Sequence, residues 1–299
     1  EYLLNEMLSA VGAPGIGKGV GIVGKTLINV GSEKLKQEFL PKILNAEIEF
    51  AVGYSEPGAG SDSAAMRLKA ERSGEGWVLS GQKIFTTSAH FADWYWVGAR
   101  TDSSRPKHDG ITLFLVPMDH PGLTVHAMYT MGGERTNGVF FDDVYVPDEY
   151  RVGELNKGFQ YIAEALDIER FTLFTFSPIR ARMELLADYV KHATRDGKPL
   201  REDPVIRQRI AQLATECEVG RLLGVKFISA AMQGGKTPTI EASCYKLYST
   251  ELSLRIANAI RRDPGADPDV LVKSLLESAL DFARQPITDD IAILALRRE

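Results

Sequence analysis

The feature that most constrains this chain is a double switch in the spacing of its apolar residues. Residues 1–49 show helical spacing, as in the run from Leu35 to Leu44 that Ser32 is expected to cap. Residues 50–150 instead carry short apolar runs separated by Gly, Asp, Asn and Pro clusters, at 77–79, 94–97, 111–116, 123–125 and 139–141. From about Gly158 the helical spacing returns. We therefore expect helices, then an antiparallel sheet domain, then a helical region.

Start and stop signals divide the second helical region. Asp203-Pro204 opens a helix that should close near Gly234-Gly235, and a further helix should run from Thr237-Pro238 to just before Asp263. Pro178 should kink or break the segment that precedes them. Beyond it, residues 264–299 combine a short amphipathic helix with an apolar run that is typical of a buried strand.

Composition narrows the class of protein. The chain has 299 residues, of which 44% are hydrophobic and 25% charged, as in ordinary globular proteins. Its net charge of −5 and lack of a basic tract argue against nucleic acid as a partner. No apolar run approaches the roughly 20 residues of a membrane span. The first residues show no signal peptide, and Glu1 suggests that the true start is missing. We expect a cytoplasmic enzyme.

Cysteine and histidine give no metal or disulfide signal. Cys217 and Cys244 are the two cysteines, and both lie in helical patterns, which fits a reducing compartment. The five histidines show no spacing typical of metal ligands, so we expect no metal site.

Two segments about thirty residues apart carry candidate binding groups. The first runs from Tyr54 through Ser55, Gly58 and Gly60 to Asp62 and follows an apolar strand. Its glycines would let backbone N–H groups approach a ligand, although such a turn is more often only a turn. The second segment, Phe85-Thr86-Thr87, could stack on a planar ring and bond its edge, but it is equally ordinary as a strand. Residues 131–147 read as a strand, a turn and an exit from the sheet.

A charged pair interrupts an apolar helical segment further on. Glu169 and Arg170 are flanked by Phe171, Phe174 and Phe176. Most such pairs are solvated surface, and that reading stays open. A carboxylate among aromatic rings would have its charged form disfavoured, which raises its pKa toward the range useful to a general base.

Taken together, in this order and spacing, these segments resemble the acyl-CoA dehydrogenase family from about Leu3 to Arg262. The most specific part is Glu56-Pro57-Gly58-Ala59-Gly60-Ser61-Asp62. The resemblance implies an α+β multidomain fold. Its expected parts are a helical N-terminal domain (1–49), a middle antiparallel β-barrel-like domain (50–155), an incomplete C-terminal four-helix bundle (156–262) and a tail outside the family (263–299).

The resemblance also implies roles for matched residues. FAD is the implied cofactor, and its implied contacts are Val52, Tyr54, Ser55, Phe85, Thr86, Thr87 and, by a weaker match, Arg195. Contacts to the acyl-CoA are implied for Ser61, Asp167 and Arg170. Glu169 matches the catalytic glutamate of the isovaleryl-type enzymes, whose Leu-Asp-x-Glu-Arg pattern is that of Leu166 to Arg170.

The implied reaction is the α,β-dehydrogenation of an acyl-CoA thioester to the trans-2-enoyl-CoA, within fatty acid metabolism. Glu169 would remove the α-proton while the β-hydrogen leaves to the flavin as hydride. An electron-transfer flavoprotein would receive the electrons, and the protein would be a homodimer or homotetramer.

The pattern departs from the family after residue 262. The family's last two helices, with their Gly-Gly-rich flavin loop, are expected there and do not appear. Asp269 to Arg298 instead resembles the end of bacterial metal-dependent serine/threonine phosphatases, which suggests a fusion or frame-jump product. Three alternatives therefore stay open, namely a non-catalytic fragment, a flavin oxidase or monooxygenase of the same fold, and, with least support, a phosphatase.

Overall fold

The computed structural model describes most of the chain, namely residues 2–13, 15, 17–131, 133–172, 175–233 and 238–261. These residues divide into two compact units. The first is Ile16–Glu169, and the second joins the described parts of residues 1–15 and 170–299. The predicted tail of residues 263–299 lies outside the described residues and stays a prediction. The four predicted domains have boundaries that differ from those of the two compact units, and they also stay a prediction.

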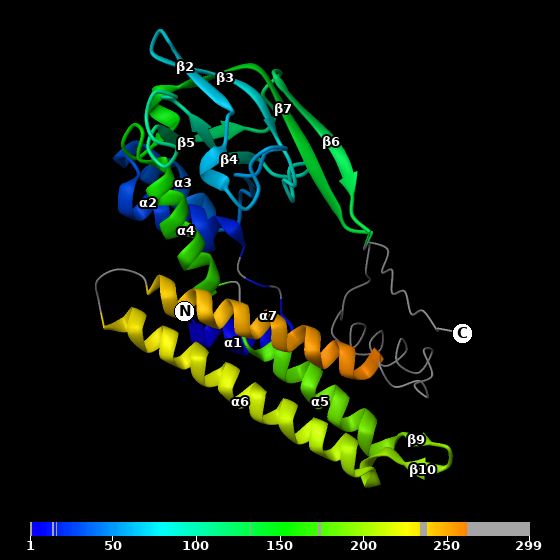
Figure 1. The fold of residues 1–299 in the computed structure, drawn as a ribbon. Coiled ribbons are helices and arrows are strands. Elements are labelled where there is room, and N and C mark those ends of the chain that lie inside the picture. The colour runs from blue at the N-terminus through cyan, green and yellow to red at the C-terminus, as the bar shows by residue number, and fades with distance from the viewer. Residues whose placement is uncertain are drawn as a thin grey trace. The chain divides into compact units, whose positions relative to one another are not determined.

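The unit of residues 16–169 holds a sheet and a group of helices (Figure 1). Its helices are a π-helix at Gly19–Gly24, α2 (Lys25–Val30), α3 (Glu33–Leu44) and most of α4 (Gly158–Thr172). Its strands are β1 (Phe50–Gly53), β2 (Lys69–Ser73), β3 (Gly76–Lys83), β4 (Trp94–Arg100), β5 (Ile111–Pro117), β6 (Leu123–Tyr129), β7 (Arg135–Pro147) and β8 (Arg151–Val152). Three-residue 3₁₀ turns lie at Ser63–Ala65 and Asp148–Tyr150. The predicted strand region is confirmed.

The sheet is mixed and open. Its strands follow the order β6-β7-β3-β2-β4-β5-β8, and β1 pairs beside this path with β4. Most neighbours are antiparallel, but β1 runs parallel to β4, with Phe50 opposite Trp94. The path ends at β6 and β8, so the closure of the sheet into a barrel is not confirmed. In Figure 1 the β6–β7 hairpin extends away from the other strands.

Both faces of the central strands are buried, which explains their uninterrupted apolar sequences. Along β4, Tyr95 and Val97 face one hydrophobic cluster inside the sheet, while Trp96 faces a second cluster. The second cluster is shared with Phe39 of α3 and Ile162 of α4. Helices α3 and α4 thus pack against the sheet through the same hydrophobic cluster, and this packing sets the position of α4 relative to the sheet.

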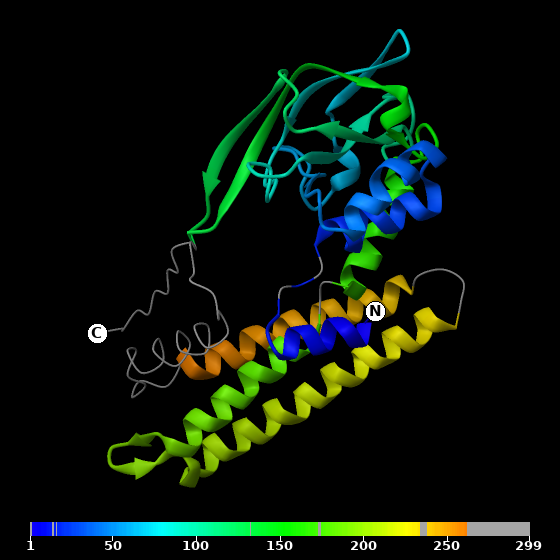
Figure 2. The same ribbon diagram turned by 180° about the vertical axis from the view of Figure 1, so that it is seen from behind.

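The other unit is helical. It contains α1 (Tyr2–Ala10), α5 (Ser177–His192), α6 (Pro204–Met232) and α7 (Thr239–Arg261), with the short strands β9 (Thr194–Arg195) and β10 (Lys198–Pro199) after α5 and a 3₁₀ turn at Leu200–Glu202. Helices α5, α6 and α7 lie side by side in both views (Figures 1 and 2) and share one apolar core.

Three local predictions are confirmed. Ser32 caps α3 by accepting a hydrogen bond from the backbone N–H of Leu35. Asp203 caps α6, where its carboxylate accepts from two backbone N–H groups. Pro178 does not sit inside a long helix, because α4 ends at Thr172 and α5 begins at Ser177, with the proline in its first turn.

Candidate functional site

The two segments that carry candidate binding groups lie side by side in the structure. The backbone N–H of Ile84 donates to the carbonyl oxygen of Ser55 over 3.0 Å. One residue earlier, the Lys83 ammonium group donates to Glu56 Oε1 over 2.8 Å and makes a longer contact of 3.4 Å with the carbonyl oxygen of Tyr54. Residues 54–56 and 83–85 therefore lie side by side in the sheet unit.

Glu56 holds the glycine-rich turn in shape. Its carboxylate accepts hydrogen bonds from the backbone N–H groups of Arg67, at 2.6 Å, and Leu68, at 2.9 Å, in addition to the bond from Lys83. The Lys83 side chain is fully buried, and burial lowers its pKa to about 8 against the opposing effect of Glu56. Buried hydrogen bonds to the Glu56 carboxylate thus hold the two ends of the turn between Glu56 and Leu68 together.

The glycines of this turn are not required by the packing of the chain itself. A Cβ atom added at Gly58 or Gly60 would meet no other atom within 4 Å. Ser61, the predicted thioester contact, lies next to them and is exposed. The turn therefore presents an open stretch of backbone and a hydroxyl group, which suits close approach by a ligand.

Tyr54 connects this turn to the core. Its hydroxyl oxygen accepts a 2.8 Å hydrogen bond from Trp96 Nε1, and its ring packs in the cluster shared by the sheet and α4. Val52, two residues earlier in β1, lies opposite Trp96 and is partly buried. Ser55 is also partly buried.

The segment from Phe85 to Ser88 is a strained turn. Phe85 and Ser88 adopt φ values of 55° and 73°, in the left-handed region that non-glycine residues seldom occupy. Phe85 is nevertheless 61% exposed, and Thr87 is exposed beside it. The chain thus holds an aromatic ring and a hydroxyl group at the surface at some energetic cost.

Thr86 plays a different part from its neighbours. Its side chain is buried and shares a 2.7 Å hydrogen bond with the hydroxyl of Tyr95. Its backbone N–H donates to the carbonyl oxygen of Asn137, and its own carbonyl oxygen accepts from Asn137 Nδ2, both over 2.9 Å. These bonds fix the turn that presents Phe85 and Thr87. The predicted flavin contact of Thr86 stays a prediction.

Helix α4 brings Glu169 to the same region. Leu166 of α4 packs in the cluster that contains Tyr54, and Glu169 follows it by three residues on the same face. Glu169 is half-buried, and its negative charge contributes, after burial, to a pKa of Tyr54 above the ordinary range. Asp167 is buried in the same helix. The side chain of Arg170 lies outside the described residues.

The aromatic surroundings predicted for Glu169 stay a prediction. The side chains of Phe171 and Phe174 lie outside the described residues, and Phe176 belongs to the core of the helical unit. The charge of Glu169 acts on Tyr54 and, more weakly than that of Glu49, on Lys18.

Sequence reasoning missed Lys18. Its ammonium group donates to Ser88 Oγ over 2.8 Å and approaches the carbonyl oxygen of Thr87 at 3.4 Å. The sequence signal for it is a single lysine within the glycine-rich stretch Gly15-Ile16-Gly17-Lys18-Gly19.

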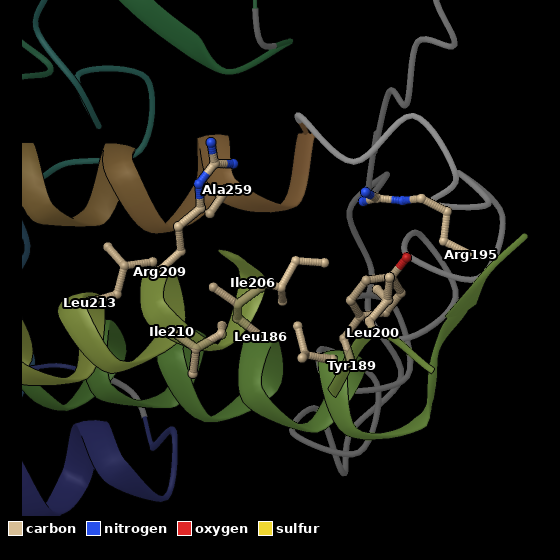
Figure 3. A pocket seen from close by; sticks show the side chains of 10 residues that line it. Leu186, Tyr189, Arg195, Leu200, Ile206, Arg209, Ile210, Leu213 and Ala259 are labelled. Carbon is tan, nitrogen blue, oxygen red and sulfur yellow. The ribbon is translucent and has the colours of Figure 1, made fainter. Parts of the chain in front are cut away.

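Arg195, the remaining predicted flavin contact, lies in the helical unit. It sits in β9 at the edge of a small cavity of about 60 Å³ (Figure 3). The other residues that line it are mostly apolar, among them Leu186, Leu200, Ile206 and Ile210. Figure 3 shows the guanidinium groups of Arg195 and Arg209 on the same side of these apolar side chains. A cavity of this size holds no more than a few water molecules.

The described residues contain neither a candidate metal centre nor a candidate membrane span. Across the described ranges, no three His, Cys, Asp or Glu side chains are grouped as a metal ion would require. Within the same part of the chain, no helix has both the length and the apolar character needed to cross a bilayer.

Two family models match this chain, one over most of the sheet region and one over the helical region that follows it. Residues 51–144 match the middle domain of acyl-CoA dehydrogenases, and residues 156–262 match the C-terminal domain of the same enzymes.

Individual relatives agree with these matches. FadE26, an acyl-CoA dehydrogenase of Mycobacterium tuberculosis, is 31% identical over 85% of this chain and 65% of its own length. The caffeyl-CoA reductase-Etf complex subunit CarC of Acetobacterium woodii is 32% identical over 77% of this chain and 62% of its own length. The chain therefore spans somewhat less than two thirds of these curated relatives.

Solved structures agree as well. The crystal structure of an acyl-CoA dehydrogenase from Geobacillus kaustophilus superposes with a TM-score of 0.81 and 32% identity, over 95% of this chain and 77% of that one. The two matched domains and this superposition together identify the chain as a member of the acyl-CoA dehydrogenase family.

Proposed function

We propose that this chain carries the flavin and thioester site of an FAD-dependent acyl-CoA dehydrogenase, which converts an acyl-CoA to the trans-2-enoyl-CoA. Members of the family are FAD flavoproteins. The observation that carries the proposal is the meeting of three elements in one unit. The turn at Tyr54 is hydrogen-bonded to the turn at Phe85, and Glu169 of α4 acts electrostatically on Tyr54.

The residues of this surface fit a flavin. Phe85 offers an exposed ring that could stack on a planar heterocycle, and Thr87 offers a hydroxyl group at the edge of such a ring. Val52, Tyr54 and Ser55 would contact it from the neighbouring turn, with Thr86 holding the Phe85 turn in place. When bound, FAD supplies the acceptor for the hydride equivalent that leaves the β-carbon.

The chain's own residues would handle the thioester and its proton. Glu169 would take the α-proton into its carboxylate, because a half-buried carboxylate can accept a proton from carbon and release it again at neutral pH. Ser61, at the open glycine-rich turn, would contact the thioester end of the coenzyme A. Asp167 and Arg170 would contact the acyl-CoA from the same helix, and Arg195 would reach the FAD of a neighbouring subunit.

The partners follow from the same proposal. We infer a homodimer or homotetramer in the cytoplasm that passes its electrons to an electron-transfer flavoprotein. The name of the relative CarC describes it as part of a complex with Etf, which supports this choice of acceptor.

One experiment separates this proposal from its alternatives. The protein is purified with added FAD, its flavin-to-protein ratio is measured, and a panel of acyl-CoAs is added without oxygen. We expect a yellow protein whose flavin bleaches with at least one acyl-CoA and regains its colour slowly in air. A protein that binds no FAD would identify a non-catalytic fragment. Fast oxygen consumption with acyl-CoA, without an acceptor protein, would identify an oxidase.

A further inference from the structure

A cleft beside the glycine-rich turn is lined mainly by basic side chains. Its volume of about 570 Å³ falls in the range of small-molecule sites. The charged side chains that line it are Arg67, Lys69, Glu71, Arg100, Arg105 and Lys107. Five of these six are positive, whereas the whole chain has a net charge of −5. The cleft therefore concentrates positive charge on a chain that is acidic as a whole.

Arg100 holds the two walls of this cleft together. It lies at the end of β4, opposite Lys69 of β2. Its guanidinium group donates to the carbonyl oxygen of Ala64 over 2.6 Å, on the wall that follows the glycine-rich turn. On the other wall, the same group donates to the carbonyl oxygens of Lys107 and Asp109, both over 3.1 Å. Because these acceptors are uncharged, the bonds shape the cleft without neutralising its central cation.

The cleft adjoins the turn that we assign to the thioester. Lys107 Nζ donates to Asp62 Oδ2 over 2.8 Å, and Asp62 directly follows Ser61 in the sequence. Ala65 and Arg67, a few residues further along the same segment, line the cleft. None of the described side chains that we assign to the flavin ring lines it. The cleft is thus placed to receive the part of a thioester ligand that lies beyond Ser61.

Arg67 differs from the other exposed basic side chains of the cleft. Those are paired with carboxylates, namely Lys69 with Glu71, Arg105 with Asp102 and Asp109, and Lys107 with Asp62. The backbone N–H of Arg67 donates to Glu56, but within the described part of the chain its exposed guanidinium group has no hydrogen bond or ion pair. Arg67 also lines a second cleft, of about 330 Å³, beside Gly58. Its side-chain donors therefore face open space on both sides.

We propose that this cleft binds the phosphate groups at the nucleotide end of the coenzyme A thioester, and that Arg67 is the side chain that selects them. A guanidinium group can donate two parallel hydrogen bonds to one phosphate. Exposed ion pairs such as those of Lys69 and Lys107 are weak, so these ammonium groups can turn toward a phosphate at little cost. This inference rests on the proposed function, because it takes the bound thioester to lie along the Ser61 turn.

The physical consequence is a preference for thioesters that carry phosphate groups. An acyl-pantetheine has the same reacting carbon atoms as the acyl-CoA but no phosphate, so it should bind more weakly. Since the cleft is open to solvent, added salt should screen the attraction and reduce the difference between the two thioesters. FAD carries phosphate groups too, and the experiment therefore measures both ligands.

The test is calorimetric titration of the FAD-loaded protein with 3′-phospho-ADP, which has the phosphate groups of coenzyme A and no thioester. Arg67→Gln should weaken its binding by about three- to tenfold, as expected for one charged contact at an exposed site. Arg67→Lys keeps the charge without the planar fork and should restore part of the affinity. Arg201→Gln removes an exposed arginine of the 3₁₀ turn Leu200–Glu202 and should leave the affinity unchanged.

Flavin bleaching gives a second readout. Arg67→Gln should raise the acyl-CoA concentration that gives half the maximal bleaching rate, with the maximal rate unchanged. For the matching acyl-pantetheine, wild type and Arg67→Gln should be equal. The variant should fold normally, because the exposed Arg67 side chain makes no bond to the described residues.

The outcomes separate this inference from the proposed function. Equal affinity of wild type and Arg67→Gln for 3′-phospho-ADP would overturn the inference, and flavin bleaching by an acyl-CoA would still support the proposed function. A loss of FAD affinity in Arg67→Gln, with nucleotide affinity unchanged, would assign the cleft to FAD and also overturn the inference. If no acyl-CoA bleaches the flavin of wild type, the proposed function fails, while the nucleotide titration still decides whether the cleft binds phosphate.

Discussion

Lys83 and Glu56 form a buried ion pair, with Nζ 2.8 Å from Oε1 and side chains that are 0% and 8% exposed. The pair connects the end of β3 to the glycine-rich turn, and Glu56 also accepts two backbone N–H groups from the far end of that turn. The shape of the turn that we assign to flavin and thioester binding therefore depends on a charge pair inside the sheet unit.

Removal of one partner from this pair should strongly destabilise the protein. Lys83→Met leaves Glu56 buried with its backbone donors alone, and the loss of one partner from a buried pair lowers the free energy of unfolding by about 3–5 kcal/mol. Urea unfolding measures this change. Lys69→Met, which breaks an exposed pair with Glu71, is the matched control and should change stability little. Equal losses in the two variants would contradict the account.

The same pair predicts a dependence of stability on pH. Burial lowers the pKa of Lys83 from 10.5 to about 8 in the folded protein. Between these two values the unfolded chain holds a proton that the folded protein has released, so stability rises with pH across this window. The difference in unfolding free energy between wild type and Lys83→Met should therefore grow from neutral pH toward pH 10. A difference that stays constant would show that Lys83 titrates normally.

Replacement of Phe85 by glycine should weaken the binding of FAD without lowering the stability of the FAD-free protein. Phe85→Gly removes a ring at a φ of 55°, where glycine is unstrained, so the FAD-free protein should keep its stability or gain up to about 1 kcal/mol. The same change should weaken FAD binding by about two- to tenfold, because an aromatic stacking contact contributes about 0.5–1.5 kcal/mol. Equilibrium titration with FAD measures the affinity. Phe91→Ala removes another exposed ring a few residues away and should leave FAD affinity unchanged.

Gly53 tests how the Tyr54 turn is packed. A Cβ atom at this position would overlap the buried ring of Tyr95, whose hydroxyl holds Thr86. Gly53→Ala should therefore lower the free energy of unfolding by about 1–3 kcal/mol or more. In a Tyr95→Leu background the same substitution should be less harmful, since the ring is gone. An equal loss of stability in both backgrounds would show that the overlap with the Tyr95 ring is not the cause.

The sequence predicted the parts of this fold that depend on local patterns. The change of apolar spacing located the strands from Trp77 onward, Ser32 and Asp203 marked helix starts, and Pro178 marked a break. The parallel pairing of β1 with β4 was not predicted, because an isolated four-residue strand does not reveal its partner.

The site was predictable only in part. The segments at Tyr54 and Phe85 were identified, and they lie side by side. The contacts of Lys83 and Lys18 were not predicted, since each joins residues that are far apart in the sequence. The environment of Glu169 was predicted from neighbours in sequence, of which Phe176 belongs to the core of the other unit. Sequence neighbours on a helix point in different directions, so they are a poor guide to the surroundings of one carboxylate.

The central claim is that Glu169 removes the α-proton of a thioester bound beside the Tyr54 and Phe85 turns. Its most direct test is the rate of flavin bleaching in Glu169→Gln after rapid anaerobic mixing with a reactive acyl-CoA. Glutamine keeps the size of the side chain but cannot take the proton. We predict unchanged FAD content and acyl-CoA binding, with bleaching slowed by about 10²–10⁴-fold. Bleaching at the wild-type rate would contradict the claim.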